Sequence, residues 1–102
     1  MEILQTEVYK RWFRRLRDPK GKARINIALQ RWRLEGQIIG DIKPLSDGVF
    51  EFRIHTGPGY RLYYMTREQQ IVLLLIGGDK GSQDSDIRRA QKLAKQLKNE
   101  RW

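Results

Sequence analysis

The segment Phe50–Tyr64 constrains the fold more than any other part of the chain. Apolar and polar residues alternate on both sides of Thr56–Gly59, a stretch that contains two glycines and a proline. Alternation with a period of two is typical of a strand, and glycine and proline mark turns. The segment is therefore predicted to form a β-hairpin.

The register of this hairpin is predicted by keeping one face apolar, because a one-residue shift moves every side chain to the opposite face. Pairing His55 with Arg61 sets Ile54 opposite Leu62 on an apolar face. Pairing His55 with Tyr60 would instead move Arg61 into that face and bury its charge without a partner. In the preferred register the polar face carries Glu51, Arg53, His55, Arg61, Tyr63 and Met65.

The composition indicates one strongly basic domain that spans residues 1–102. The formal net charge is +9, from 21 Lys and Arg against 12 Asp and Glu. Residues 1–35 hold ten basic and four acidic residues (+6), residues 81–102 hold six and three (+3), and residues 36–80 hold five of each. Such an excess favours a nucleic acid or an acidic protein as partner, and the alternative is a solvated surface that keeps a small protein soluble.

Several classes of function are disfavoured by what the sequence lacks. There is no Cys and one His, so no disulfide, thiolate site or metal cluster is expected. The glycine pairs Gly57/Gly59 and Gly77/Gly78 do not have the spacing of a phosphate-binding or dinucleotide-binding loop. No apolar run is long enough to cross a membrane, and the N-terminus lacks the pattern of a secretory signal. We expect a cytoplasmic protein without metal or cofactor.

The other elements are predicted from hydrophobic periodicity and capping residues. In chain order they are a strand at Glu2–Gln5, a helix from Thr6, a helix from Asp18-Pro19 to Gly36, a strand at Asp41–Leu45, a strand at Ile71–Ile76, a loop at Gly77–Gly81, and a helix capped by Ser82 or Asp84. The run 71–76 is apolar without alternation, which predicts a central strand buried on both faces. This order is typical of an α+β domain.

The cationic face of the hairpin is the main candidate for chemistry. Arg53 and Arg61 suit bidentate contact with a phosphate. Lys80 follows the buried strand in a loop, where functional side chains often gather. Tyrosines can stack on the bases of single-stranded RNA, and the candidates are Tyr60, Tyr63 and Tyr64.

Each candidate also has a structural alternative. The two arginines would then pair with Glu51 or Asp79, because structural ion pairs mimic functional clusters. His55 would be an exposed histidine at a strand end rather than a proton shuttle. Tyr63 and Tyr64 point to opposite faces, so at least one of them is expected in the core.

Stretches along nearly the whole chain resemble the RelE/ParE superfamily of toxins from bacterial toxin–antitoxin systems. The resemblance is to the HigB-like branch, the "addiction module killer proteins". It rests on Leu16–Asp18, Gly40–Leu45, Gly48–Ile54, Gly57–Tyr64, Leu74–Lys80, Gln83–Ile87 and the basic helix that follows. It implies a RelE-like fold, with two N-terminal helices on a twisted, antiparallel-rich sheet of about four or five strands and a C-terminal helix.

The resemblance also implies an activity, because nuclease members of the superfamily cut mRNA in the ribosomal A site. Arg61 matches the strand arginine that contacts the scissile phosphate. Lys80 lies near the loop that supplies a catalytic His or Tyr in some relatives, and this loop has neither residue. Arg53 and Lys43 fall on neighbouring strands where relatives place catalytic groups, and Lys43 is a candidate RNA contact.

The mechanism expected from this resemblance is metal-independent endoribonuclease cleavage, in which the ribose 2′-hydroxyl attacks the phosphate. Arg61 and Arg53 would clamp the phosphate, since preorganised cations stabilise the charge of the transition state. Lys80 would stabilise charge or donate a proton to the leaving oxygen. His55 or Glu51 would assist proton transfer.

Two other functions stay open at this point. ParE-type relatives share the fold and inhibit DNA gyrase by binding, and the lack of a C-terminal His or Tyr is compatible with that class. A basic RNA-binding or DNA-binding domain without toxic activity is the third possibility. For a toxin, the expected partners are the ribosome, mRNA and a cognate antitoxin, commonly of helix-turn-helix type, in a hetero-oligomer that involves no membrane.

Overall fold

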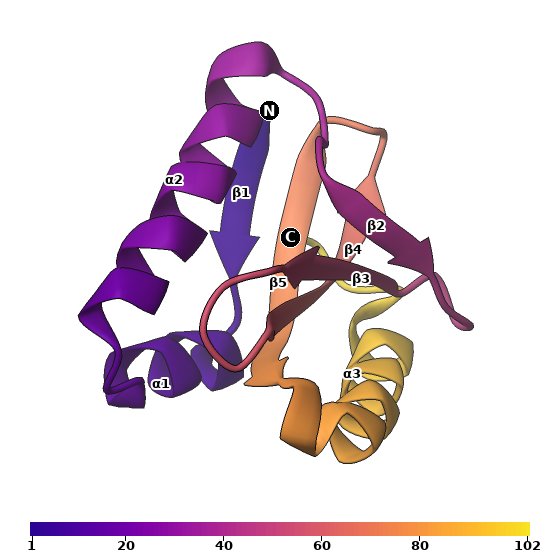
Figure 1. Ribbon diagram of the computed structural model, residues 1–102. Helices are drawn as coiled ribbons and strands as arrows, with labels where there is room; N and C mark the ends of the chain where they lie inside the picture. Colours follow the sequence, from indigo (N-terminus) through magenta and orange to yellow (C-terminus); the bar gives the residue numbers. More distant parts are fainter.

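Three α-helices surround a five-stranded mixed sheet in the computed structural model, which describes all residues from 1 to 102 (Figure 1). The elements are β1 (Glu2–Gln5), α1 (Glu7–Arg15), α2 (Pro19–Glu35), β2 (Asp41–Pro44), β3 (Phe50–Ile54), β4 (Tyr60–Arg67), β5 (Ile71–Asp79), the 3-10 helix η1 (Lys80–Ser82) and α3 (Gln83–Leu97). The predicted α+β class is confirmed. None of the helices combines the length and apolarity that crossing a membrane requires.

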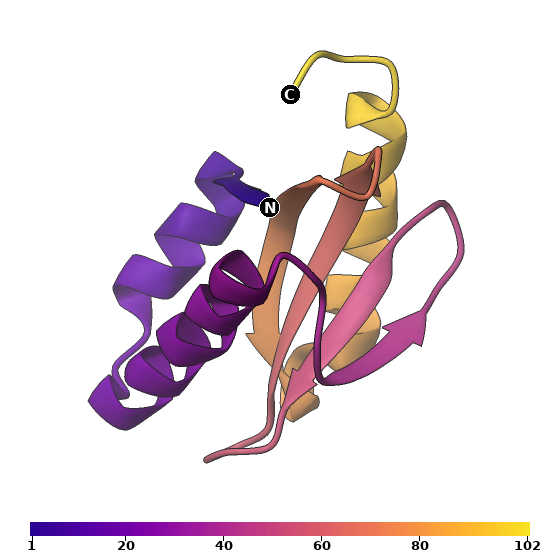
Figure 2. The same cartoon turned by 90° about the horizontal axis from the view of Figure 1, so that it is seen from above.

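The strands lie in the order β1-β5-β4-β3-β2. β1 runs parallel to β5, and every other neighbouring pair is antiparallel. The helices α1 and α2 cover one face of the sheet and α3 covers the other (Figure 2). β5 therefore has a strand on each side and helices on both faces, which explains why its sequence is apolar without alternation.

The two N-terminal helices begin where the sequence predicts. The hydroxyl of Thr6 accepts the backbone N–H of Tyr9 at 3.0 Å and caps α1. Asp18 caps α2 by accepting the N–H of Gly21 at 3.0 Å, with proline at the first helical position. α2 ends at Gly36, whose φ of 67° is the left-handed conformation that glycine adopts most easily.

Of the two predicted caps of α3, Ser82 holds the N-cap position and Asp84 lies inside the helix, but the predicted capping bond is absent. Ser82 precedes the helix but makes no capping bond with its side chain. Its hydroxyl instead donates to Oδ2 of Asp86 at 2.5 Å. The capping carboxylate of this region is Asp79, which accepts the N–H groups of Gly81 and Ser82 and so fixes η1.

The predicted loop at Gly77–Gly81 is also wrong, because Gly77 and Gly78 continue β5. A Cβ on Gly77 would overlap the ring of Trp12 on one face of the sheet, and a Cβ on Gly78 would overlap the carboxylate of Asp86 on the other. Glycine here permits close packing against an extended strand and does not mark a turn.

The hairpin has the predicted faces but a different register. The residue opposite Arg61 is Arg53, where the prediction had His55. Ile54 lies opposite Tyr60. The pairing is shifted by two residues from the prediction, so each side chain keeps the face assigned to it. The consequence is that two arginines face each other directly across β3 and β4.

Tyr60 is the first residue of β4 and lies on the apolar face, opposite Ile54. It is 3% exposed, and its hydroxyl donates to Oδ2 of Asp18 at 2.5 Å. This contact holds Tyr60 on the apolar face, beside Trp12, at the start of β4. The turn that precedes it contains Gly57 and Gly59 with φ of 53° and 80°.

The sheet separates two apolar clusters. The cluster under α1 and α2 is built around Trp32, whose indole N–H donates to the carbonyl of Ile39 at 2.8 Å. The cluster under α3 contains Leu75 and Ala90 together with the larger side chains of Tyr63 and Met65. Tyr63 and Tyr64 point to opposite faces as predicted, and the fold buries both of them.

Candidate functional site

A single carboxylate organises the candidate site. Arg53 and Arg61 each donate their Nε–H to Oε1 of Glu51, at 2.8 and 3.1 Å. Glu51 is fully buried, whereas the side chains of Arg53 and Arg61 are 29% and 11% exposed. The carboxylate therefore lies beneath the two guanidiniums and holds them at the surface of the sheet. We call Glu51, Arg53 and Arg61 the arginine cluster.

The helix α3 contributes to the arginine cluster through its first residue. Nε2 of Gln83 lies 3.2 and 3.3 Å from the two carboxylate oxygens of Glu51. Gln83 is not among the residues that the sequence predicts for the site. A polar residue at a helix start gives no signal in the sequence that it will reach a residue 32 positions earlier.

Lys80 lies beside the arginine cluster. Nη1 of Arg61 donates to the carbonyl oxygen of Gly59 at 3.1 Å. A Cβ placed on Gly59 would lie 3.5 Å from Nη1 of Arg61 and 3.8 Å from Cβ of Lys80. The fold therefore brings these two cations, from β4 and η1, to either side of one loop residue. Lys80 is exposed and has no ion-pair partner.

Lys43 and His55 lie at the other edge of the site. Lys43 is exposed on β2 and pairs with Glu51 in the register of β2 and β3. Nε2 of His55 is 2.7 Å from Oδ2 of Asp41, and Asp41 lies opposite Arg53. The His55 side chain is 74% exposed just after β3 and has an acidic partner.

Tyr60 and Tyr63 do not offer a free ring to a base, contrary to the predicted stacking role. They are 3% and 0% exposed. Tyr60 packs on the apolar face because of its bond to Asp18, and α3 covers Tyr63 on the other face. The Tyr63 hydroxyl is buried without a hydrogen-bond partner.

The electrostatics of the site favour an anionic ligand. The hydrogen bond to Glu51, followed by the charge of Glu51, raises the pKa of the Arg53 guanidinium above its usual value. Burial raises the pKa of Tyr63, so this phenol is neutral at any physiological pH. No group of three or more His, Cys, Asp or Glu side chains is arranged to hold a metal ion. The site thus presents fixed, permanently charged guanidiniums.

The arrangement of helices and strands matches that of two solved structures. The chain superposes on a chain of the E. coli RelBE toxin–antitoxin complex with a TM-score of 0.59 and 16% identity, over 76% of this chain and 94% of that one. It superposes on the isolated E. coli RelE toxin with a TM-score of 0.58 and 14% identity, over 85% and 96%. The predicted RelE-like fold is therefore confirmed.

The sequence comparisons show the family. The chain belongs to the phage-derived Gp49-like protein family (DUF891), whose model matches residues 11–99. It is also 41% identical over 97 residues to a Haemophilus influenzae protein described as uncharacterized, a match that covers 95% of this chain and 96% of that protein. Membership of the HigB-like branch stays a prediction.

Proposed function

We propose that this protein is the toxin of a toxin–antitoxin pair and that it cleaves mRNA on the ribosome without a metal ion. The observation that carries the proposal is the arginine cluster, in which one buried carboxylate holds two guanidiniums on a sheet of RelE-like fold. Metal-independent cleavage by the 2′-hydroxyl needs cations fixed at the phosphate, because charge develops there in the transition state. Fixed arginines meet that requirement.

The free nitrogens of the arginine cluster support this role. The Nε atoms of Arg53 and Arg61 bind Glu51, and Nη1 of Arg61 binds Gly59. Both Nη atoms of Arg53 and Nη2 of Arg61 have no hydrogen-bond partner in the protein. Terminal guanidinium nitrogens in this arrangement suit contact with the non-bridging oxygens of a phosphate.

The other residues take different roles in this proposal. Glu51 is a positioning residue, since its oxygens are buried and occupied by Arg53, Arg61 and Gln83. Lys80 is exposed on a flexible side chain, so it stabilises charge or donates a proton to the leaving oxygen. His55 is the proposed proton-transfer group, and Lys43 the proposed RNA contact.

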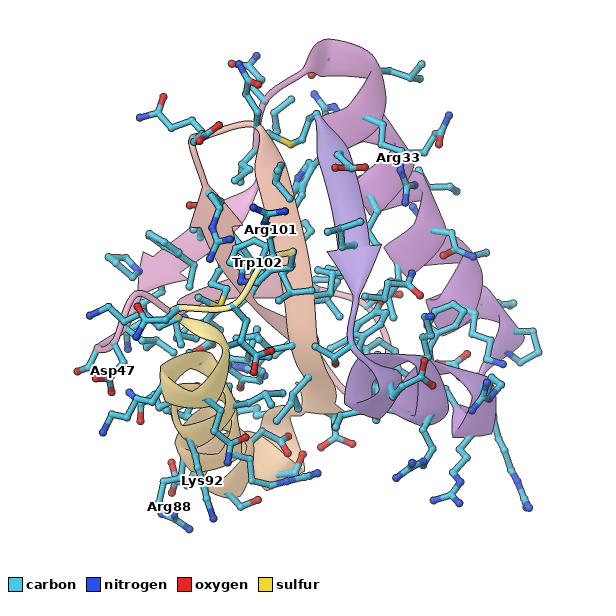
Figure 3. All side chains as sticks on the ribbon, turned by 180° about the vertical axis from the view of Figure 1, so that it is seen from behind. Arg33, Asp47, Arg88, Lys92, Arg101 and Trp102 are labelled. Carbon is cyan, nitrogen blue, oxygen red and sulfur yellow. The ribbon has the colours of Figure 1, made fainter.

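The test is the double variant Arg61→Ala/Lys80→Ala, expressed under an inducible promoter. Wild type is expected to arrest growth and to cleave ribosome-bound mRNA, and the double variant to do neither. A matched control is Arg33→Ala/Lys92→Ala, which also removes one arginine and one lysine. These two side chains project from α2 and α3, outside the arginine cluster (Figure 3).

Circular dichroism and thermal unfolding establish that both double variants are folded. A folded Arg61→Ala/Lys80→Ala variant that still arrests growth would overturn the proposed site. Loss of activity in both double variants would mean that total charge matters and that the cluster does not.

Inhibition of DNA gyrase is the second candidate function. The segment Asp79–Ser82 keeps this function open, because it carries neither the His nor the Tyr of some nuclease relatives. Plasmid supercoiling and mRNA 5′ ends, both followed after induction, separate the two functions. New mRNA ends with unchanged supercoiling support the ribonuclease, and relaxed plasmid with intact mRNA supports gyrase inhibition.

The proposed protein partner is a cognate antitoxin, of helix-turn-helix type if the HigB-like assignment holds. Its expected site is the basic surface, because the chain carries a formal charge of +9. The test is co-purification with the product of the adjacent reading frame. Growth arrest that this product does not relieve would count against the pairing.

A further inference from the structure

A second basic surface lies outside the arginine cluster. A cleft of about 490 Å³ opens between α1 and α3 at the end of β5, and we call it the α1–α3 cleft. Arg11, Arg15 and Arg17 line it from the α1 side, and Arg89 lines it from α3. Its floor is the backbone of Gly77 and Gly78.

The arginines of the α1 wall have no charge partner. Arg11 and Arg15 are exposed, and no carboxylate lies within ion-pair distance of either one. They are four residues apart on a helix, where like charges repel and destabilise the helix. Arg89 reaches a carboxylate only at 4.0 Å, that of Asp86. A ligand that supplies negative charge would relieve this repulsion on the α1 wall of the cleft.

The two carboxylates of the cleft are already occupied. Asp79 accepts the N–H groups of Gly81 and Ser82, and Asp86 accepts the hydroxyl of Ser82. Both contacts fix the start of α3 against the strand. Asp86 also pairs with Arg89, so the cations of the cleft without a carboxylate partner are Arg11, Arg15 and Arg17. Four arginines against two aspartates leave the cleft lining a formal charge of +2.

The position of the cleft relates it to the arginine cluster. Arg61 on β4 pairs with Gly78 on β5, and Gly78 forms part of the cleft floor. Neighbouring strands lie about 4.8 Å apart, so the outer edge of β5 is within reach of a short chain bound at Arg61. β1 pairs with β5 only as far as Leu74, which leaves the last part of this edge without a partner strand. Lys80 follows β5 directly and is next in the chain to Asp79, which lines the cleft.

We propose that the α1–α3 cleft binds the phosphate backbone of single-stranded RNA, next to the nucleotides held at the arginine cluster. This inference rests on the proposed ribonuclease function. RNA is favoured as the ligand because its charges repeat along a chain, so one strand can reach the cluster, Lys80 and the cleft. Arginine also suits phosphate through bidentate contact, and the cationic lining of the cleft is entirely arginine.

The experiment measures binding of a fluorescently labelled 2′-O-methyl RNA by anisotropy. This RNA has no free 2′-hydroxyl, so the measurement does not depend on cleavage. The cleft variant is Arg11→Gln/Arg15→Gln, and the matched control is Arg24→Gln/Arg33→Gln on α2. Both double variants remove two exposed arginines that have no ion-pair partner.

We expect the cleft variant to bind about tenfold more weakly, and the control to stay within about twofold of wild type. The slope of log affinity against log salt should fall by about 1.4 for the cleft variant, because each lost phosphate contact of a single strand contributes about 0.7. Thermal unfolding should show that the cleft variant is folded, since it loses a repulsive pair.

Equal weakening by both variants would overturn the inference, because it would mean that only total charge matters. The inference would also be overturned if the cleft variant bound RNA as tightly as wild type does. If that variant then bound polyglutamate more weakly than wild type, the ligand of the cleft would be an acidic protein. The ribonuclease proposal can fail separately from this one. In that case wild type cleaves no mRNA, while the cleft variant still binds RNA more weakly than wild type.

Discussion

Arg53 and Arg61 lie directly opposite each other across β3 and β4, and both donate to the same oxygen of Glu51. Two like charges at opposed positions of an antiparallel pair repel each other. The buried carboxylate between them offsets this repulsion and fixes the direction of both guanidiniums. The geometry of the site therefore depends on Glu51, a residue that no ligand can reach.

Glu51→Gln is expected to lower the free energy of unfolding by about 2 kcal/mol. The variant keeps the shape of the side chain but leaves two guanidiniums without a counter-charge. Solvent around Arg53 keeps the loss below that of a fully buried pair. Urea unfolding provides the measurement, with the exposed Glu100→Gln as the control. A loss under about 0.5 kcal/mol would show that the pairs contribute little to stability.

Tyr63→Phe is expected to raise stability by about 1 kcal/mol. The Tyr63 hydroxyl is buried without a partner, and removing an unsatisfied polar group removes its desolvation cost. Tyr60→Phe should have the opposite effect by a similar amount, because that hydroxyl bonds Asp18. Denaturant unfolding of both variants tests this contrast. Destabilisation by Tyr63→Phe would indicate that the hydroxyl has a buried water as partner.

Gly77→Ala is expected to destabilise the protein by about 1–3 kcal/mol, because the added methyl group overlaps the ring of Trp12. The check is a double-mutant cycle in which Gly77→Ala is also introduced into Trp12→Leu. The cost of the alanine should be much smaller in that background. If Gly77→Ala lowers the free energy of unfolding equally in both backgrounds, the cause is the conformation of the strand and not the contact with Trp12.

The acid stability of the protein should depend on Asp18. The Tyr60 hydroxyl, followed by the N–H of Gly21, lowers the pKa of Asp18, while burial and Asp18 raise the pKa of Tyr60 to about 12. A carboxyl group whose pKa is lower in the folded protein than in the unfolded chain adds to the free energy of unfolding. This contribution is complete above the pKa of the unfolded chain, about 4, and is lost as the pH falls through the pKa of the folded protein.

Tyr60→Phe should therefore raise the pKa of Asp18, which an NMR titration of the carboxyl carbon measures. The stability difference between wild type and Tyr60→Phe should shrink as the pH falls from about 5 towards 2. A difference that stays constant over this range would mean that the hydrogen bond does not favour the ionised form of Asp18.

Much of the fold could be predicted from local sequence because its causes are local. Alternation with a period of two assigned Glu51, Arg53 and Arg61 to one face, and a register shift of two residues does not change a face. The caps at Thr6 and Asp18 were predictable since a side chain there reaches a backbone N–H three residues on. The pattern of the chain is thus enough to place the arginines together on one surface.

The register and the packing were decided by contacts between residues far apart in the chain. Asp18 accepts the hydroxyl of Tyr60 from 42 residues away, at the first residue of β4, and Arg53 lies opposite Arg61 in the next pair of the ladder. Gln83 reaches Glu51 from 32 residues away and closes the site from α3. Local sequence was enough to predict most helices and strands and which face of the hairpin carries the charged residues. The partner of each charge, and the burial of polar residues such as Glu51 and Tyr63, followed from packing, because they depend on elements that meet only after the chain has folded.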